Sequence, residues 1–145
     1  MKLGKILYLI VLTAALTACA GPSNKPVVFD EEQRQALLER VTERWRALEQ
    51  GDYATSWEYT SPAFRKAFPK NLYLKKFSYA VRWELTGVDV LNYDDEAVVA
   101  SVVVGVMSHP TKLTSAASQA VGAIPRELRE RWVFVDGEWW YSANY

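Results

Sequence analysis

Cysteine and histidine, which supply most metal ligands and many nucleophiles, are almost missing from this sequence. Among 145 residues there is one of each, Cys19 and His109. One cysteine cannot form an intramolecular disulfide, and a lone histidine argues against a structural zinc site. The sequence also contains neither a glycine-rich phosphate loop nor a Gly-x-Ser-x-Gly nucleophile motif. We therefore expect a fold that depends on packing, with no metal and no cofactor.

An excess of positive charge is missing too. The 17 basic residues equal the 17 acidic ones, and without Lys2 and Lys5 a net charge near −2 would remain. Proteins that bind nucleic acids usually present a basic face. We therefore expect no nucleic-acid partner.

The one cysteine ends the run Leu16-Thr17-Ala18-Cys19. Two lysines stand near the start, and an apolar stretch from Ile6 to Leu16 is too short to span a bilayer comfortably. This layout is typical of a secretory signal peptide. The four-residue run also resembles the lipobox of bacterial lipoproteins, whose cysteine receives a diacylglycerol and becomes the mature N-terminus. An ordinary signal peptide with an incidental cysteine is the alternative.

The lipobox resemblance predicts three parts: a signal peptide over 1–18, a lipidated tether over 19–28 and one domain over 29–145. A tether of this length reaches about 30 Å when fully extended. Several acyl chains on Cys19 would anchor the chain durably in a membrane. The resemblance further implies that Ala20, rather than Asp, favours the periplasmic face of the outer membrane if the source is Gram-negative.

The first half of the domain carries helix signals. Asp30 is a predicted N-cap with Gln33 three residues later, as in a capping box. Apolar residues then recur at helical spacing at Leu37, Val41, Trp45 and Leu48. Gly51 fits the helix end, and Asp52 can cap a second helix. Ser61-Pro62 begins a short third helix, with Pro62 tolerated at its first position. Residues 71–77 can add one more turn.

After Ser78 the sequence becomes rich in β-branched residues, which are typical of strands. Residues 81–93 and 96–108 flank Asp94-Asp95, while 131–135 and 138–143 flank Asp136-Gly137, a strong hairpin signal. Helices followed by antiparallel strands predict an α+β fold, with N-terminal helices packed on a sheet of about four strands.

Aromatic residues are plentiful, with six tryptophans and eight tyrosines. A two-residue turn at Asp136-Gly137 would place four of them, from Trp132 to Tyr141, on one face and leave Trp140 on the other. Trp140 is then either a surface contact or partly covered. The predicted core or pocket aromatics are Trp45, Tyr53, Trp57, Trp83, Trp132, Phe134, Trp139 and Tyr141.

Asp89 is the best single catalytic candidate. In a regular ladder it would share an apolar face with Trp83 and Leu85, and desolvation would raise its pKa. A bulge at Gly87 would instead turn Asp89 to water. We favour the bulge because an isolated buried carboxylate is costly.

Three segments together resemble the nuclear transport factor 2-like, or cystatin-like cone, superfamily. They are Leu48-Glu49-Gln50-Gly51-Asp52-Tyr53, Ser61-Pro62-Ala63-Phe64-Arg65 and the final strand pair from Arg131 to Trp140. The resemblance implies a curved sheet that wraps around helices and forms an apolar pocket. The superfamily includes ketosteroid isomerase and polyketide-cyclase-like proteins, and many members are non-enzymatic. The enzymes place an Asp base with Tyr or Asp donors, or an Asp/His pair, in the cone, and no such set matches here.

The segment from His109 to Leu128 is expected to be irregular. It reads as a short helix that begins at Thr114 or Ser115, with Pro125 starting another turn, and it is either a lid or docking surface or a floppy insertion. The charge run over 126–131 is expected to be a solvated face. His109 is expected in a solvent-facing turn, although a dyad with Asp89 is imaginable.

These observations favour a membrane-anchored envelope lipoprotein whose domain is a non-enzymatic module for a small apolar ligand or an envelope protein. The alternative is an acid–base enzyme with Asp89 as base and Tyr53, Tyr79 or Tyr141 as donors. A third arrangement is a homodimer through the outer sheet face at Val103, Val133 and Trp140.

Overall fold

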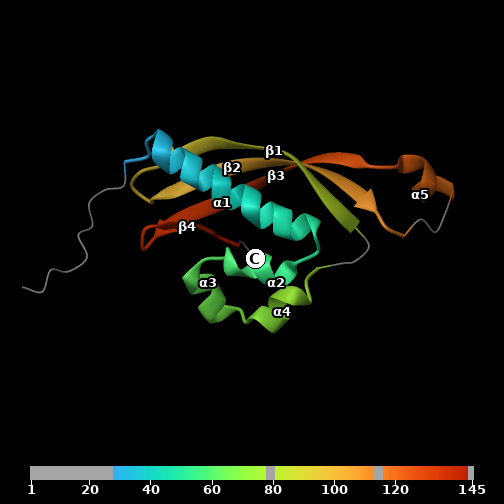
Figure 1. Ribbon diagram of the computed structural model, residues 1–145, viewed down its shortest axis with the longest axis horizontal. Coiled ribbons are helices and arrows are strands. Elements are labelled where there is room, and N and C mark those ends of the chain that lie inside the picture. Colours follow the sequence, from blue (N-terminus) through green and yellow to red (C-terminus); the bar gives the residue numbers. More distant parts are fainter. Residues whose placement is uncertain (1–27, 78–80, 113–115, 144–145) are drawn as a thin grey trace, which may run out of the picture.

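A four-stranded antiparallel sheet with helices packed against it forms the protein (Figure 1). The computed structural model describes residues 28–77, 81–112 and 116–143. The elements are, in chain order, α1 (Glu31–Glu49), α2 (Tyr53–Glu58), α3 (Pro62–Ala67), α4 (Lys70–Leu74), β1 (Val81–Asp94), β2 (Val99–Pro110), α5 (Ala116–Val121), β3 (Ile124–Val135) and β4 (Glu138–Tyr141). The strands follow one another in the sheet in the order β1-β2-β3-β4. The predicted α+β class is confirmed.

Side-chain caps begin the first three helices, and those at Asp30 and Asp52 were predicted. The Asp30 carboxylate accepts the backbone N–H of Gln33 at 2.9 Å at the start of α1. Asp52 accepts both the N–H and the hydroxyl of Thr55 in α2, and these bonds lower the pKa of Asp52. The Ser61 hydroxyl accepts the N–H of Phe64 in α3 at 3.2 Å. Each cap satisfies a helix N–H that has no partner within its own helix.

The long β1–β2 ladder contains two bulges. Its register shifts between Leu85 and Gly87 and again between Val90 and Asn92. The first shift confirms the predicted bulge, because Val88 is half-buried while Asp89 is exposed. Opposite this bulge, a Cβ at Gly105 would lie 2.8 Å from the Thr86 hydroxyl oxygen. Bulges of this kind bend a strand and increase its twist.

The segment after α5 differs from its prediction. Pro125 does not start a helical turn. It lies in β3, which pairs with β2 from Ser108↔Ile124 to Val99↔Val133. A proline near the beginning of a strand removes only one hydrogen-bond donor, whereas the ladder pairs ten residues of β3 with Val99–Ser108 of β2. The predicted short helix is present as α5, and its predicted caps Thr114 and Ser115 lie outside the described residues.

The core lies between α1 and the facing side of the sheet. Its buried members are Leu37, Val41, Trp45, Leu48, Tyr53, Ala100, Val102, Val104, Val106, Trp132 and Trp139. Near the beginning of α1, Phe29 stacks on Tyr93 at 4.6 Å and meets Trp139 edge-on at 5.8 Å. All of these residues follow Val28, so the chain from residue 28 contains this core in full. No helix among the described residues is long and apolar enough to cross a bilayer.

Both outer strands of the sheet have backbone groups satisfied by neighbouring segments. At β4, the Tyr141 N–H donates to the Tyr59 carbonyl at 2.8 Å, and the Ser61 N–H donates to the Tyr141 carbonyl at 2.9 Å. At β1, the N–H of Leu85 donates to the carboxylate of Glu49 on α1. The segment at Tyr59–Ser61 therefore covers one edge, and a side chain of α1 covers part of the other.

Replacing Leu37 by Ala tests the position of the core. Leu37 has no exposed surface, and a cavity at such a site lowers the free energy of unfolding by about 2–5 kcal/mol. Leu91→Ala is the matched control, because Leu91 is 48% exposed and should change stability by no more than about 0.5 kcal/mol. Urea unfolding measures both, and equal effects would contradict this placement of α1.

Candidate ligand cavity

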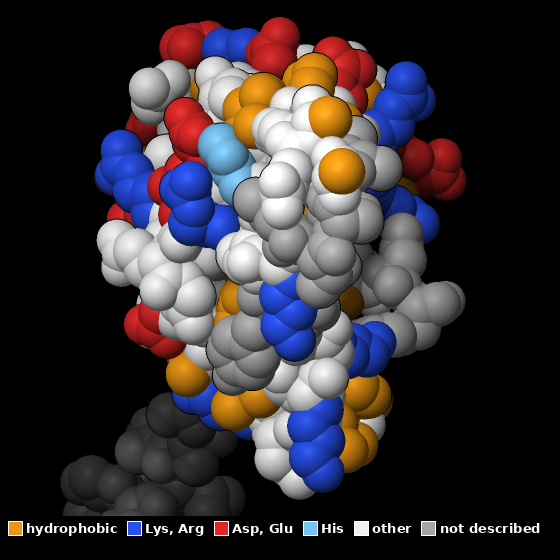
Figure 2. Space-filling view, turned by 90° about the vertical axis from the view of Figure 1, so that its right-hand side faces the viewer, with side chains coloured by type: hydrophobic (Ala, Val, Ile, Leu, Met, Phe, Trp, Pro, Cys, Tyr) orange, Lys and Arg blue, Asp and Glu red, His pale blue; other side chains and the backbone are white. Residues whose placement is uncertain are grey.

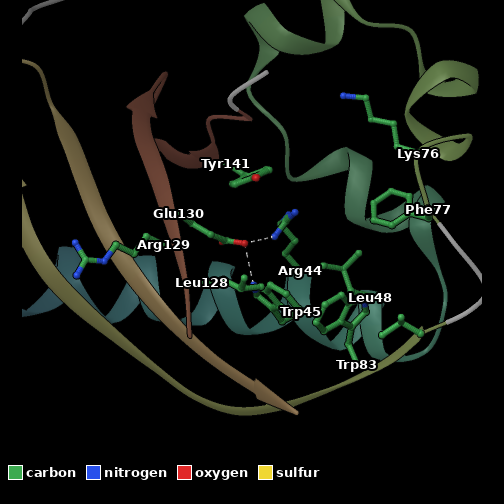
Figure 3. A pocket seen from close by; sticks show the side chains of 11 residues that line it. Arg44, Trp45, Leu48, Lys76, Phe77, Trp83, Leu128, Arg129, Glu130 and Tyr141 are labelled. Atoms are coloured by element: carbon green, nitrogen blue, oxygen red, sulfur yellow. Dashed lines mark hydrogen bonds and ion pairs between the residues drawn. The ribbon is translucent and has the colours of Figure 1, made fainter. Parts of the chain in front are cut away.

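A partly open cavity of about 450 Å³ lies between the C-terminal half of α1 and strands β1, β3 and β4. Its lining residues are Arg44, Trp45, Leu48, Lys76, Phe77, Val81, Trp83, Leu128, Arg129, Glu130 and Tyr141 (Figure 3). Most of the wall is apolar or aromatic. Its volume falls within the range of pockets that hold small molecules, about 300–1,000 Å³.

The periodicities of helix and strand place these residues. Arg44 and Leu48 are four residues apart and share one face of α1. Along β3, Leu128 and Glu130 point inward, whereas Arg129 points away from the cavity (Figure 3). Aromatic contacts position the remaining wall: Trp83 meets Trp45 edge-on at 6.2 Å, and Phe77 stacks on Tyr53 at 4.1 Å.

A buried ion pair forms one side of the cavity. Arg44 Nη1 donates to Glu130 Oε1 at 2.7 Å, and both side chains are 6% exposed. The indole N–H of Trp45 donates to the same oxygen at 3.0 Å, and the indole N–H of Trp132 donates to Oε2, also at 3.0 Å. Three donors thus hold both carboxylate oxygens, which offsets the desolvation that makes buried pairs costly.

The protonation states around Arg44 follow from its neighbours. Burial disfavours the charged guanidinium, but attraction to Glu130 together with Tyr73 and Tyr141 leaves the pKa of Arg44 raised. The guanidinium carbon lies 3.8 Å from the centre of the Tyr141 ring. Burial raises the pKa of Tyr141 although Arg44 opposes the rise. At neutral pH the arginine is therefore charged and the phenol is neutral.

The predicted aromatic residues divide into wall and core. Trp45, Trp83 and Tyr141 line the cavity. Trp132, Trp139 and Tyr53 belong to the buried core, and Trp57 and Phe134 are half-buried.

Trp140 lies between two arginines, so it is partly covered rather than free. The guanidinium carbon of Arg40 lies 4.7 Å from the ring centre and that of Arg65 lies 4.8 Å away. Its indole N–H donates to the carbonyl of Val135 at 3.1 Å. Because β4 is an outer strand of the sheet, arginines from α1 and α3 can reach this ring.

The candidate catalytic residues lie elsewhere. The Asp89 side chain is 66% exposed, accepts a hydrogen bond from Arg34 at 2.8 Å and is not part of the cavity wall. His109 is not in a turn: it lies in β2 opposite Arg82, and its Nε2 is 2.8 Å from a Glu84 carboxylate oxygen. Asp89 pairs with Val103, six residues along β2 from His109, so the two do not form a dyad. Tyr79 lies outside the described residues.

Glu130 and Arg44 were missed as functional candidates. The prediction that the charge run over 126–131 is a solvated face is wrong for Glu130, which is 6% exposed. A signal was present, because Glu130 stands two residues before Trp132 and strand alternation puts both on the inner face. Helical spacing also puts Arg44 on the face of Leu37, Val41 and Leu48, but its partner lies 86 residues away in the chain and could not be identified from the sequence.

Comparisons with known proteins give distant structural likenesses. Aln2 from a Streptomyces species has a TM-score of 0.47 at 13% identity, covering 77% of this chain and 87% of that one. A SEC-C motif protein from Rhodopseudomonas palustris has a TM-score of 0.42 at 14% identity, with coverage of 72% and 73%. A protein from Xanthomonas campestris pv. campestris, proposed to be a polyketide cyclase, has a TM-score of 0.47 at 16% identity, with coverage of 77% and 92%. No family model and no curated protein matches the sequence. Likenesses this distant assign no activity, ligand or partner.

Breaking the buried pair should be far more damaging than breaking a surface pair. Glu130→Leu leaves the Arg44 charge buried without a partner, so the free energy of unfolding should fall by about 3–5 kcal/mol. The double variant Arg44→Met/Glu130→Leu removes that charge and should recover part of the loss. Urea unfolding of Arg44→Met, Glu130→Leu and the double variant measures the coupling.

Glu58→Gln is the control, because Glu58 forms an exposed pair with Lys70 at 2.8 Å. Exposed pairs contribute at most about 1 kcal/mol. A similar loss in Glu58→Gln and Glu130→Leu would show that the Arg44–Glu130 pair is not buried.

Proposed function

We propose that this chain is an envelope lipoprotein, anchored through Cys19, whose domain binds a small ligand with an aromatic or otherwise apolar body. The observation that carries the proposal is the cavity wall of Trp45, Phe77 and Trp83, which encloses a space suited to a ring-sized group. Flat aromatic walls favour stacked or edge-on contacts with such a group. The resemblance to the cone superfamily, whose members have an apolar pocket, supports the same function.

A polar group on the ligand would meet the hydroxyl of Tyr141. This side chain lines the cavity and is half-buried. Its hydroxyl makes no hydrogen bond with the residues that the structure describes. A neutral phenol can both donate and accept, so it suits a carbonyl or hydroxyl group on the ligand.

Binding is favoured over acid–base catalysis by the state of the one carboxylate in the wall. Among the described residues that line the cavity, Glu130 alone carries a carboxylate. Both of its oxygens already accept hydrogen bonds. Three protein donors fix the Glu130 side chain and Arg44 pairs with its charge, which supports a structural role for it. Glu130 is held as part of the wall, and Asp89 is too far outside to act as a general base.

The cavity predicts saturable binding of anilinonaphthalene sulfonate, an anionic fluorescent probe with an apolar aromatic body, to the lipid-free chain of residues 20–145. Leu128→Trp adds volume to a half-buried wall position and should weaken binding at least about ten-fold, because each well-placed 1.4 kcal/mol of lost contact is a factor of ten. Fluorescence titration measures the dissociation constant.

Leu91→Trp is the matched control, since Leu91 is exposed and does not line the cavity. Its probe affinity should equal that of the parent chain. Equal weakening by both substitutions, or a probe signal that never saturates, would contradict the proposed binding site.

Anchoring is tested separately through Cys19. In bacterial cells the full chain should partition into the detergent phase, and mass spectrometry of its N-terminal peptide should show a diacylglycerol on Cys19. Cys19→Ala should lose the lipid mass, because no thiol remains to accept it. A processed chain with an unmodified thiol would contradict the anchoring and leave the cavity unaffected.

A further inference from the structure

The segment between the second helix and the first strand is strongly basic. From Tyr59 to Trp83 the sequence contains six cationic residues and no carboxylate. In the fold, α3 and α4 from this segment form the lower end of the molecule (Figure 1). Figure 2 shows Lys, Arg and hydrophobic side chains at this lower end, whereas the Asp and Glu side chains gather higher up.

Some of these charges are already neutralised. Glu58 lies 3.4 Å from Arg65 and 2.8 Å from Lys70. Lys66 on α3 and Lys75 after α4 are exposed and form no ion pair with the described residues. These two lysines therefore keep a positive charge that is available to a partner.

Exposed leucines lie in the same segment. Leu72 is 42% exposed and Leu74 is 37% exposed, while Tyr73 between them is only 4% exposed. The Tyr73 hydroxyl lies 3.1 Å from the Ser56 hydroxyl, which holds α4 with Tyr73 inward and its neighbours outward. We call the exposed set Lys66, Leu72, Leu74 and Lys75 the basic corner.

We propose that the basic corner rests on an anionic lipid bilayer. Lysines attract acidic headgroups while neighbouring leucines enter the boundary between headgroups and acyl chains. The inference rests on the proposed anchoring for the nearness of a membrane. A tether over 19–28 reaches about 30 Å, which matches the roughly 28 Å length of a 19-residue helix such as α1. A tether of that reach keeps the domain within about one length of α1 from the bilayer.

The domain as a whole is slightly negative, so attraction to an anionic surface needs a local group of cations such as the basic corner. Residues 20–145 carry 15 basic and 17 acidic side chains, so the domain as a whole is weakly repelled by an anionic surface. Attraction then requires cations that gather on one side without carboxylates, which is what α3 and α4 provide.

Co-sedimentation of the lipid-free chain 20–145 with vesicles tests the proposal. The chain contains the complete core described above, and its folding is checked by thermal unfolding. It should bind phosphatidylcholine vesicles that contain about one-third phosphatidylglycerol, and bind pure phosphatidylcholine far less. Lys66→Glu/Lys75→Glu should lower the partition constant at least about 30-fold, because each lysine near an anionic surface contributes roughly five-fold.

Two further variants separate the basic corner from general charge. Arg126→Glu/Arg131→Glu makes the same change in net charge at exposed positions on β3 and should leave partition within about two-fold. Leu72→Ser/Leu74→Ser should also weaken binding, since it removes the apolar contact.

No binding of the parent chain to anionic vesicles would overturn the proposal, and so would equal losses in the two double-glutamate variants. Because this chain carries no lipid, the result is independent of whether Cys19 is modified. A chain that binds vesicles but is never lipidated in cells would contradict the anchoring alone.

Discussion

The interaction on which the rest of the structure depends is the charge pair between Arg44 and Glu130. It joins the C-terminal half of α1 to a residue of β3 that lies 86 positions later in the chain. Two tryptophans, Trp45 and Trp132, donate to the same carboxylate, so the pair also orients these two rings. A buried charge without these donors would be costly. The pair therefore specifies one depth and rotation for α1 against the sheet.

This constraint shapes the cavity as well as the core. The same turn of α1 that carries Arg44 also presents Trp45 and Leu48 to the open space. Farther along the chain, stacking of Phe77 on Tyr53 closes the opposite wall. On the polar side of the cavity both Glu130 oxygens accept hydrogen bonds, while Trp45, Phe77 and Trp83 line the open space on the aromatic side. That division suits recognition of an apolar body more than a chemical step on it.

Local signals could be read from the sequence and non-local ones could not. The caps Asp30, Asp52 and Ser61 act within one helical turn, and the Asp136-Gly137 turn sets the pairing of Phe134 with Trp139 over five residues. The start of β3 depends on β2, which lies before α5 in the chain. Periodicity alone does not reveal such pairing, so Pro125 and Glu130 were assigned to a turn and a solvated face. Trp45, Trp83 and Tyr141 stand out in the sequence as aromatic residues at helix or strand spacing, whereas Phe77 and the ion pair reach the cavity through contacts between distant segments.

The covered edges of the sheet affect how copies of the protein behave beside one another. An open outer strand is a template to which a second chain can add its own strand, and this is a common start of aggregation. Here Tyr141 is paired on its outer side with Tyr59 and Ser61, and the flanking Trp140 lies between two positive guanidinium groups. At β1, the backbone N–H of Leu85 donates to the side-chain carboxylate of Glu49. For a protein that we propose is anchored in a membrane, the cover on β4 would keep neighbouring copies from adding a strand at that edge of the sheet.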